Sequence, residues 1–535
     1  MARSALFRLV RSIAARARPQ PASAGDAAAA QQHRRAAARR AENVEARREL
    51  LRRGVAAAAA TLLPLPGAAG GVTRGPATVA VVGGGLAGLA AAWRLAEAGV
   101  AATLFEAAPR VGGRCWTERR AFDGGQIAER GGELIDTSHD EIIDLALALG
   151  LVLDDLDAAT PRGTRQAWWI DGRRYDEADA VRDFRGLWPA LASDARLLGD
   201  DPPTFARHTS AQRALDHTDA ASWLATRVPG GSASPLARLL ANAYVEELGA
   251  DLAEISAVTV VDLLRDSPRD RVSPYEESDQ RYHVRGGNDL LVQRMAEPLA
   301  ARIETGHRLL AVARRDDGRY RLVFARDQAT READFDHVVL AVPFTMLRDV
   351  DLARAGLRPR KMQAIRELGM GRNTKLQLQF DDRAWIARGG NGETRVEGSY
   401  QVSWEVTRGQ PGTQGILNFY SGGAAASRAG EGSPDDRARA ALADLERIHP
   451  GIAAHWNGRV IRNAWDRHPW SRGSYSLLKP GQYTAFHGIE HLPEGGIQFA
   501  GEQSSAVWYG YLNGAVESGQ RAAAAILRAA PRRAA

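Results

Sequence analysis

Three glycines followed at a distance by an acid are the first residues whose types and spacing could do chemistry. Gly83, Gly85 and Gly88 form the pattern Gly-x-Gly-x-x-Gly, and Glu106 lies 23 residues after the first glycine. In such a loop the first glycine permits a tight turn, the second lets a pyrophosphate approach the backbone, and the third lets a helix pack closely on a strand. The acid then accepts hydrogen bonds from ribose hydroxyls, so the pattern predicts a dinucleotide site.

The glycine pattern needs a strand before it and a helix after it, and the sequence predicts both. Residues 79–82 are all apolar, as expected for a parallel strand that is buried on both faces. A helical pattern runs to residue 98, Gly99 ends it, and residues 101–105 predict a second strand. The amino end of the helix would hold phosphate oxygens through its free N–H groups and its dipole. This context makes the pattern specific, because isolated glycine matches arise easily in an alanine-rich chain.

Residues 110–114, just beyond the acid, have the sequence Arg-Val-Gly-Gly-Arg. Here the chain resembles the flavin amine oxidase family, whose fingerprint continues past the acid into an Arg-x-Gly-Gly-Arg turn. The resemblance implies that the cofactor is FAD. It also implies that Gly113 brings backbone amides to the FAD pyrophosphate and that Arg114 adds positive charge beside it.

The resemblance returns near the C-terminus and extends from about residue 78 to 528. Residues 497–502 predict a buried strand that ends in Gly501 and Glu502. In the family, the residues at these two positions contact the ribityl and phosphate side of the flavin, and the resemblance implies the same contacts here.

A closing block, residues 508–519, opens a helix that runs to Leu527. The block is similar to the closing motif of flavin amine oxidases. The resemblance implies that Ala515 and Val516 lie at the helix end beneath the isoalloxazine ring. There the helix dipole favours a reduced, anionic flavin.

Two tyrosines extend the resemblance to the substrate side. Tyr475 follows the Arg-Gly-Ser of residues 472–474, and Tyr511 belongs to the closing block. The family carries an aromatic cage at these positions, whose two ring faces guide an amine toward the flavin. An aromatic pair without that context is more often simple packing. Ser474 stands where some members carry a cysteine bonded to FAD, which implies a non-covalently held cofactor.

Two residues in the middle of the chain are candidates through the resemblance. Val312 falls where a backbone amide meets the adenine in the family. Lys375 lies in residues 373–380, where polar and apolar residues alternate and predict a strand. The resemblance implies a lysine that hydrogen-bonds a water at flavin N5 and assists the reaction with oxygen. The alternative is an exposed lysine on the polar face of the strand, which is the usual environment of lysine.

The substrate contacts are predicted from position alone. Glu133 and Asp136 lie in residues 131–136, a segment that passes the flavin in relatives. Either acid could select a cationic group of a diamine, a polyamine or a basic amino acid, or could be a solvated acid or a helix cap. Trp508, at the start of the closing block, is a third candidate. An amino acid substrate would also need an arginine for its carboxylate, and no motif singles one out.

The activity that the resemblance implies is oxidation of a carbon–nitrogen bond of an amine or L-amino acid. A hydride equivalent passes to flavin N5, the imine is hydrolysed, and oxygen restores the flavin with formation of hydrogen peroxide. Two alternatives remain open: an FAD desaturase or isomerase that acts on carbon–carbon bonds, and a redox-silent flavin-binding subunit. The tyrosine pair argues against the first, and the tyrosines together with Lys375 argue against the second.

These motifs predict an α/β fold in which a Rossmann-like FAD-binding domain is interwoven with an α+β substrate-binding domain. The first substrate segment looks mainly helical, and the second mixes strands, at 375–380 and 415–420, with a helix at 435–448. The expected boundaries of the FAD domain are 75–150, 281–344 and 461–530, and those of the substrate domain are 151–280 and 345–460.

The distribution of charge argues against a nucleic-acid partner. Residues 1–74 contain 14 Arg, no Lys and four acids, a net charge of +10. The remainder has 56 basic and 60 acidic residues, a net charge of −4, and so lacks the basic surface of a nucleic-acid binder. The single cysteine, Cys115, excludes an intramolecular disulfide and a cysteine-based zinc site. We expect a small-molecule substrate and oxygen as partners and no metal, and we leave a homodimer open.

Residues 1–74 form a leader rich in arginine and alanine. Arg47 and Arg48 precede a weakly hydrophobic run at residues 55–63, and small residues follow Pro66. These features predict twin-arginine (Tat) export to the periplasm or the medium. A transit peptide and a polar tail on a cytoplasmic protein are the alternatives. Because the apolar run is about half as long as a bilayer span, we expect no membrane anchor.

Overall fold

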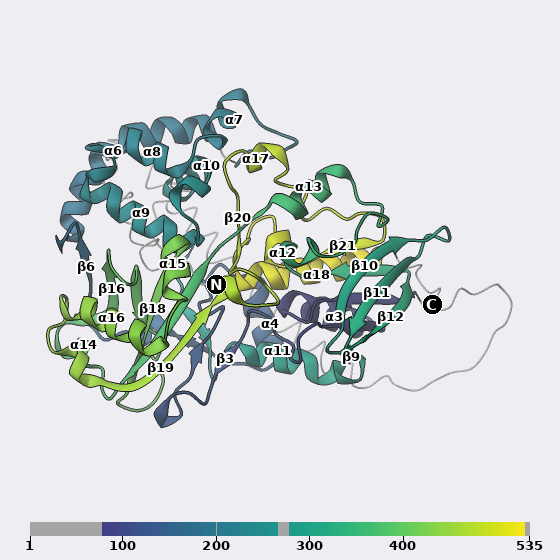
Figure 1. The fold of residues 1–535 in the computed structure, drawn as a ribbon, viewed down its shortest axis with the longest axis horizontal. Helices are drawn as coiled ribbons and strands as arrows, with labels where there is room; N and C mark the ends of the chain where they lie inside the picture. The colour runs from purple at the N-terminus through teal and green to yellow at the C-terminus, as the bar shows by residue number, and fades with distance from the viewer. Residues whose placement is uncertain (1–76, 200, 266–277, 530–535) are drawn as a thin grey trace, which may run out of the picture.

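The computed structural model describes residues 77–199, 201–265 and 278–529, and Figure 1 shows their arrangement. The molecule has two parts. One part is built on a parallel sheet and lies to the right in Figure 1, and the other combines a large mixed sheet with a group of helices and lies to the left. The twin arginines of the leader lie outside the described residues.

A five-stranded sheet with the order β21-β13-β1-β2-β9 forms the first part, and all four of its pairings are parallel. β1 lies in the middle and all of its residues are buried, which explains its unbroken apolar sequence. The strands predicted at 79–82 and 101–105 are confirmed. The strands of this sheet are β1 (Val79–Val82), β2 (Ala102–Phe105), β9 (Ile303–Glu304), β13 (His337–Leu340) and β21 (Ile497–Phe499).

Helices α3 (Leu86–Glu97) and α18 (Leu512–Ala529) pack closely on each other and on this sheet. Glycine makes the close approach possible, since a Cβ built at Gly519 would lie 2.2 Å from the carbonyl oxygen of Ala87. A side chain there would push the two helices apart. Helices α4 (Asp140–Ala148) and α11 (Asp289–Ala296) pack beside them.

A three-stranded antiparallel sheet flanks the carboxyl end of β2. Its strands are β10 (Arg308–Arg314), β11 (Tyr320–Arg326) and β12 (Ala329–Phe335), paired in that order. Phe324 of β11 stacks on Phe105, the last residue of β2, with 4.2 Å between the ring centroids. This contact fixes the small sheet against the end of the parallel sheet.

The second part is built on a seven-stranded mixed sheet with the order β19-β15-β18-β17-β16-β6-β7. Because its strands come from residues 165–174 and 373–464, both predicted substrate segments contribute to it, and β19 crosses the boundary expected at 460; the domain division stays a prediction. The strands are β6 (Arg165–Ile170), β7 (Arg173–Arg174), β15 (Asn373–Phe380), β16 (Gly390–Val396), β17 (Val402–Glu405), β18 (Gly415–Gly422) and β19 (Trp456–Ala464).

The two faces of this sheet differ in chemistry. Leu376, Leu378 and Phe380 of β15 face α16 (Pro434–Glu446) and form an apolar core with it. Lys375 and Gln377 alternate with them and lie on the opposite face. Every residue of β15 is nevertheless buried, so the alternative of an exposed lysine is wrong. Another segment of the chain covers the polar face.

A group of helices covers the upper left of the molecule in Figure 1. α9 matters most for the site, because its carboxyl end approaches Tyr475. It begins after the capping residue Ser234 with Pro235 in its first turn, and Gly249 ends it in the left-handed conformation. The helices are α6 (Glu177–Leu198), α7 (Ser210–Asp216), α8 (Ala220–Arg227), α9 (Pro235–Leu248) and α10 (Ala257–Leu264).

Shorter helices and strands complete the fold. The helices are α5 (Leu156–Ala159), α12 (Phe344–Leu347), α13 (Pro359–Glu367), α14 (Ala384–Ala387), α15 (Gly423–Ala429) and α17 (Gln482–Ala485). The strands are β3 (Thr117–Glu118) with β4 (Ala128–Glu129), β5 (Leu153–Asp155) with β8 (Tyr282–Val284), and β14 (Gly369–Met370) with β20 (Ser476–Leu477).

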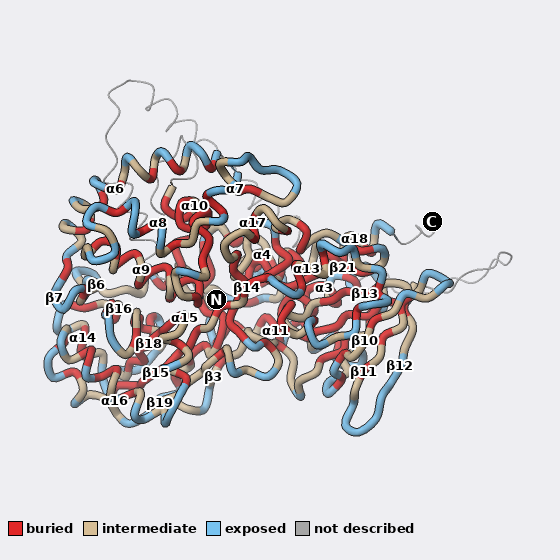
Figure 2. Tube along the Cα trace, turned by 45° about the horizontal axis from the view of Figure 1, so that its top comes forward, coloured by how far each residue is buried: buried red, intermediate tan, exposed pale blue. Residues whose placement is uncertain are grey.

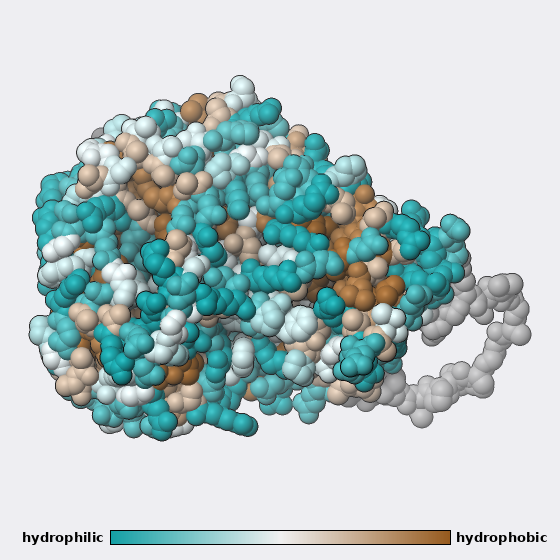
Figure 3. All heavy atoms as spheres, viewed as in Figure 1, coloured by the Kyte–Doolittle hydropathy of each residue, from teal (hydrophilic) through white to brown (hydrophobic). Residues whose placement is uncertain are grey.

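Burial follows these layers, with buried residues along the inner strands and exposed ones on the outer face of α6 (Figure 2). In Figure 3 most of the visible face is hydrophilic, and hydrophobic residues gather right of centre, over the region of α12 and β10. None of the helices in the described ranges combines the length and apolar composition that a membrane crossing requires.

Candidate functional site

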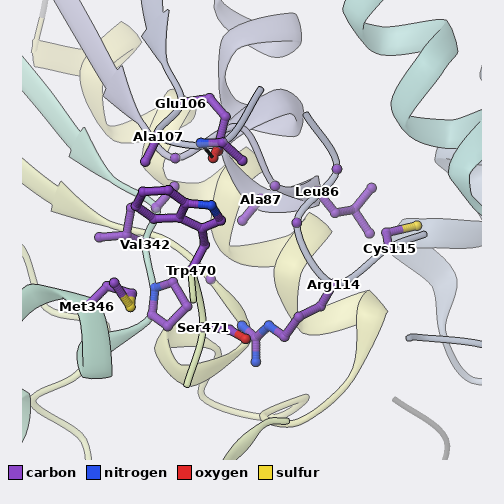
Figure 4. Close-up of a pocket in the computed structure, with 18 of the residues that line it drawn as sticks. Leu86, Ala87, Glu106, Ala107, Arg114, Cys115, Val342, Met346, Trp470 and Ser471 are labelled. Atoms are coloured by element: carbon purple, nitrogen blue, oxygen red, sulfur yellow. Dashed lines mark hydrogen bonds between the residues drawn. The ribbon is translucent and has the colours of Figure 1, made fainter. Parts of the chain in front are cut away.

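A cavity of about 710 Å³ lies where β1, β2 and β13 end. The carboxyl edge of a parallel sheet is the place where open α/β folds bind their ligands, because the loops there diverge. Most of the predicted cofactor-binding residues meet at this cavity (Figure 4). Those that line it are Gly83, Gly85, Glu106, Gly113, Arg114, Gly501, Glu502 and Ala515, together with Tyr511 from the predicted cage.

The three glycines of the loop have different surroundings. Gly83 has a φ of +104°, which a side chain rarely adopts, and it turns the chain out of β1. A Cβ at Gly85 would meet no atom within 4 Å, so this position opens onto the cavity. A Cβ at Gly88 would lie 1.9 Å from the carbonyl oxygen of Gly83. Gly88 does not line the cavity, and it acts by letting α3 approach the turn.

Glu106 holds the glycine loop through its carboxylate. Its Oε2 accepts a hydrogen bond from the amide of Gly84 at 2.6 Å, and its Oε1 accepts one from the amide of Ala108 at 2.7 Å. Burial raises the pKa of Glu106, and these two amides and the nearby Arg110 act in the opposite direction. Each carboxylate oxygen keeps a further lone pair, so the acid can also accept from ribose hydroxyls at the cavity.

The Arg-x-Gly-Gly-Arg turn lies against the glycine loop. The amide of Gly112 donates to the carbonyl of Gly84 at 2.7 Å, and Gly113 has a φ of +54°. The side chain of Arg110 folds back onto the turn and donates to the carbonyl of Gly113 at 2.7 Å. The turn is therefore fixed by its own side chain, with its backbone facing the cavity.

Arg114 and Glu502 form an ion pair across the cavity wall. The distance from Arg114 Nη1 to Glu502 Oε1 is 2.9 Å. Glu502 also accepts from Ser476 Oγ at 2.6 Å and from the amide of Gly510 at 2.9 Å. Because one carboxylate ties three segments together, Glu502 fixes the loop that carries Tyr511.

The structure corrects one predicted contact and bears on a second. Val312 is buried in β10, and its amide donates to the carbonyl of Asp351 at 2.9 Å, so that amide is not available for an adenine. His307 and Leu309 line that end of the cavity instead. Val516 is fully buried in the core between α18 and the parallel sheet, while Ala515 faces the cavity. Successive side chains on a helix differ in direction by about 100°, so the side chain of Val516 points away from the cavity, and a contact of Val516 with the flavin stays a prediction.

The predicted cage tyrosines both lie next to Gly510. Gly510 lines the cavity and precedes Tyr511, and a Cβ built on it would lie 3.8 Å from Cδ2 of Tyr475. The hydroxyl of Tyr475 donates to the carbonyl of Glu247 at the end of α9. Burial, together with the neighbouring Tyr420, raises the pKa of Tyr475 far above its ordinary value, so its ring is a neutral phenol.

Lys375 lies on the polar face of the large sheet, turned toward residues 129–133. Its Nζ is 2.5 Å from Oε2 of Glu133 and donates to the carbonyl of Glu129 at 3.1 Å. The other oxygen of Glu133 accepts from Trp404 Nε1 at 2.8 Å. The charge of Glu133 is thus already balanced inside the protein, which argues against its role as a selector of cationic substrates; that role stays a prediction.

Asp136 and Trp508 meet through a histidine that the sequence did not single out. His139 is fully buried, and its Nε2 lies 3.3 Å from Oδ2 of Asp136, whose Oδ1 accepts from the amide of Gln280. The ring of His139 meets those of Trp508 and Tyr511 edge-on, at 4.9 and 4.8 Å between centroids. Asp136 thus pairs with the histidine that packs against Trp508 and Tyr511, and the structure gives no support for its predicted contact with a cationic substrate.

Several cavity residues have no signal in the sequence. Trp470 comes from the loop before Tyr475, and Figure 4 shows its indole projecting into the cavity between Val342 and Ala87. The loop is fastened by Thr345 Oγ1, which donates to the carbonyl of Ser471 at 2.6 Å. Only the position of this loop in the fold, beside β13, brings it to the cavity. Trp404 and Tyr420 do not line the cavity, but the sequence gives no signal for them either, and they lie near Lys375 from β17 and β18 of the large sheet.

The residues present fit an extended dinucleotide. A positive-φ glycine loop, an open Gly85, an acid at the end of β2 and an arginine beside the cavity supply what two phosphates and a ribose require. The cavity continues from Phe105 and His307 at one end to Gly132, Tyr511 and Ala515 at the other. Ser474, at the position of the covalent link in some relatives, carries no thiol and donates to Asn373 Oδ1 at 2.5 Å. Among the described residues, no cluster of metal-ligating side chains occurs.

The fold and this cavity define a two-part flavoprotein oxidoreductase whose dinucleotide domain carries a separate substrate part. The sequence model described as flavin containing amine oxidoreductase matches residues 86–527, and the chain belongs to this family. It is therefore an enzyme that acts as a flavin-dependent oxidoreductase of amines or amino acids, with FAD, non-covalently held, as its cofactor.

Known relatives cover nearly the whole described chain. The flavin-dependent L-tryptophan oxidase RebO of Lentzea aerocolonigenes is 27% identical over 484 residues, which span 85% of this chain and 99% of that protein. Amine oxidase A of Bos taurus is 24% identical and covers 84% of this chain and 85% of its own. The structure of cyclohexylamine oxidase from Brevibacterium oxydans IH-35A superimposes with a TM-score of 0.73 at 24% identity, over 85% of this chain and 99% of that one. Putrescine oxidase bound to putrescine gives a TM-score of 0.70 at 23% identity, with coverages of 84% and 99%, and these two structures support the fold.

Proposed function

We propose that the protein is an FAD-dependent oxidase of a primary or secondary amine or an L-amino acid that uses molecular oxygen and forms hydrogen peroxide. The observation that carries the proposal is the position of Gly510. This residue lines the cavity together with Tyr511, and a Cβ built on it would lie 3.8 Å from the ring of Tyr475. Two uncharged aromatic faces at the end of a flavin cavity suit a neutral amine with a free lone pair.

The proposed reaction balances as follows. The substrate loses two electrons and two protons and becomes an imine. Oxygen takes up both electrons and both protons and becomes hydrogen peroxide, and water adds to the imine and releases ammonia, or an amine, and a carbonyl product. The bound flavin supplies the electron transfer, and the protein supplies position and electrostatics.

The residues of the chain have separate tasks in this proposal. Tyr475 and Tyr511 bound the substrate and keep water away from its amine. The amino end of α18, which begins beside Tyr511, stabilises negative charge on the reduced cofactor. Lys375 provides a buried cation near Gly132, at the same end of the cavity, where oxygen gains negative charge.

The pairing of Glu133 and Asp136 within the protein bears on whether the substrate is a diamine or a monoamine. Glu133 and Asp136 are both engaged within the protein, by Lys375 and by His139. The two acids therefore give no reason to expect a second cationic group on the substrate. Arg114, which lines the cavity, is paired with Glu502. The relative RebO, which is an L-tryptophan oxidase by its name, makes an aromatic L-amino acid a useful test substrate.

The test is anaerobic mixing of the yellow protein with a panel of monoamines, diamines and L-amino acids. We expect the flavin absorbance to bleach with at least one of them, and we expect one peroxide per substrate when oxygen is admitted. A C–C desaturase would bleach with an amine-free substrate. A flavin that no compound reduces would leave the redox-silent subunit as the better description.

We also propose that the leader directs Tat export. Its support is the pair Arg47 and Arg48 before the mild apolar run at 55–63. Replacement of both arginines by lysine should retain the protein inside cells of a Tat-competent bacterium. The matched control replaces Arg39 and Arg40, which do not precede an apolar run.

A further inference from the structure

Glu133 is a buried acid whose two oxygens have two different partners. Oε2 lies 2.5 Å from Lys375 Nζ, and Oε1 accepts from Trp404 Nε1 at 2.8 Å. The side chains of Glu133 and Lys375 are 4% and 3% exposed. The partners come from β15 and β17, which are not neighbours in the sheet. One carboxylate therefore spans two strands.

The backbone of Glu133 is fixed beside the cofactor cavity. Asn288 Nδ2 donates to the carbonyl of Glu133 at 2.7 Å and to that of Gly132 at 3.2 Å. Gly132 lines the cavity next to Leu512, since a Cβ on Gly132 would lie 2.5 Å from Cδ2 of Leu512. Glu133 thus directly follows a residue of the cavity wall. Asn288 holds its backbone, and Lys375 and Trp404 hold its carboxylate.

The charged surroundings of Lys375 leave one anion facing its ammonium within the described structure. The carboxylate of Glu129 is turned toward His283, at 2.9 Å, and only its backbone carbonyl meets Lys375. The cross-strand neighbours of Lys375 on the same sheet face are Tyr420 and Asn463. Burial raises the pKa of Tyr420 well above its ordinary value, so this phenol is neutral. The ring of Trp404 lies 5.6 Å from Nζ.

We propose that Glu133 is a positioning residue for Lys375: its carboxylate keeps the buried lysine protonated and holds the ammonium toward the flavin end of the cavity. An ammonium taken out of water without a counterion loses its proton readily, and a carboxylate in contact opposes that loss. The inference rests on the proposed function. When oxygen accepts two electrons from the reduced cofactor and two protons, negative charge appears on it first, and a fixed cation lowers the barrier.

The chain offers a matched control on the same strand. Glu405 follows Trp404 in β17 and points to the opposite face of the sheet. It is 2% exposed, lies 2.7 Å from Arg383 Nε and accepts from Trp385 Nε1 at 3.0 Å. Its arrangement repeats the acid, the cation and the tryptophan of the site, but it lies away from the cavity.

The experiment measures how fast oxygen restores the absorbance of flavin that has been chemically reduced without substrate. We expect Lys375→Met and Glu133→Gln each to slow this step on the order of 10²-fold, the size of effect seen when one preorganised donor is removed from developing charge. The double variant should be little slower than either single one. Glu405→Gln should reoxidise like the wild type. In Glu133→Gln the pH above which the rate falls should be lower than in the wild type, because the ammonium has lost its counterion.

Two further measurements examine the role of Glu133 if the Glu133→Gln variant folds poorly. Trp404→Phe removes the hydrogen bond to Oε1 and keeps the ring, and it should slow reoxidation several-fold. Urea unfolding of the flavin-free proteins should show coupling between positions 133 and 375 and none between 405 and 375. If Lys375→Met is slow while Glu133→Gln and Trp404→Phe both match the wild type, the inference is overturned and the proposed oxidase stands. If Lys375→Met reoxidises normally, the role of Lys375 and the inference fall together.

Discussion

The cofactor cavity and the polar face of the large sheet are built in different ways. At the cavity the important groups are backbone amides and open glycines, and Glu106 uses both oxygens to hold amides of its own loop. On the sheet face the important groups are side chains that pair with side chains from distant segments, such as Lys375 with Glu133. One region is a shaped backbone surface, and the other is a buried network of charges.

This difference predicts two kinds of variant. Changes to the glycines and backbone amides at the cavity should alter flavin binding and show little dependence on pH, because these groups do not titrate. Changes on the sheet face should leave the flavin bound and alter the pH dependence of stability or of the oxygen reaction. A variant on the sheet face that loses its flavin, or a glycine variant at the cavity with a strong pH dependence, would contradict this distinction between the two regions.

The largest effect is expected at Gly88. A Cβ there would lie 1.9 Å from the backbone of Gly83, so Gly88→Val should yield a protein that is unstable and colourless. Gly85→Ala provides the contrast, because its Cβ meets no atom within 4 Å and fills only the cavity. It should unfold at nearly the wild-type temperature but bind FAD far more weakly. The ratio of flavin to protein absorbance and the melting curve measure both. A yellow, stable Gly88→Val protein would contradict the packing role.

A smaller effect is expected at Glu106. Glu106→Ala leaves the amides of Gly84 and Ala108 without their acceptor and removes the group that faces the ribose. Hydrogen bonds to a charged group contribute about 1.5–3 kcal/mol, so FAD affinity should fall by roughly 10- to 100-fold. Titration of the flavin-free protein with FAD measures the loss. Glu97→Ala, on the exposed end of α3, is the control and should bind FAD normally. Equal affinities in all three proteins would show that Glu106 does not hold the loop.

The same contrast explains how much of the molecule the sequence predicts. The glycine loop, its strand and its helix are local, so spacing alone predicts the strand, the turn and the helix, and it brings Gly83, Gly85 and Glu106 to the cavity wall. Their contacts with a cofactor stay a prediction. The parallel sheet joins strands from three segments, and family resemblance was needed to expect it. The strand that carries Lys375 was also predicted from its alternation.

The sequence could not predict which residue pairs with each buried charged side chain. Glu133 looked equally suited to bind a substrate, because nothing local shows that a strand 242 residues away places a lysine beside it. His139 and Trp404 were missed for the same reason. Val312 was wrong by a few residues, and the side chain of Val516 points into the core, since a contact with a ligand depends on which side of a strand or helix faces the cavity.

Two variants at Tyr475 distinguish the contribution of its ring from that of its hydroxyl. Tyr475→Ala removes one wall, and kcat/KM for the amine should fall roughly 10-fold or more, equivalent to about 1.4 kcal/mol of lost transition-state binding. Tyr475→Phe keeps the wall and loses the hydroxyl's hydrogen bonds, of which the one to the carbonyl of Glu247 is the shortest, with about 1 kcal/mol of stability. Steady-state kinetics and urea unfolding distinguish the two effects. If Tyr475→Phe is as slow as Tyr475→Ala, the hydroxyl and not the ring carries the function.

The finest test of the comparison is the pH dependence of the pair formed by His283 and Glu129. His283 Nε2 lies 2.9 Å from Oε1 of Glu129, whose backbone carbonyl accepts from Lys375. Burial lowers the pKa of His283, but the hydrogen bond and charge of Glu129 outweigh it and raise the pKa above the ordinary value of 6.5. The folded protein therefore binds this proton more tightly than the unfolded chain does. The resulting stabilisation is complete below pH 6.5 and is lost as the pH rises through the raised pKa.

His283→Gln should thus lower the free energy of unfolding by about 1–3 kcal/mol at pH 6, and the difference from the wild type should shrink as the pH is raised. Urea unfolding at several pH values measures it, with His208→Gln as the control on an exposed histidine. Flavin content should not change, because the pair lies on the side-chain network and not on the backbone cradle. A stability difference that stays constant with pH would mean that His283 contributes packing alone, and a loss of flavin would show that the two regions are coupled.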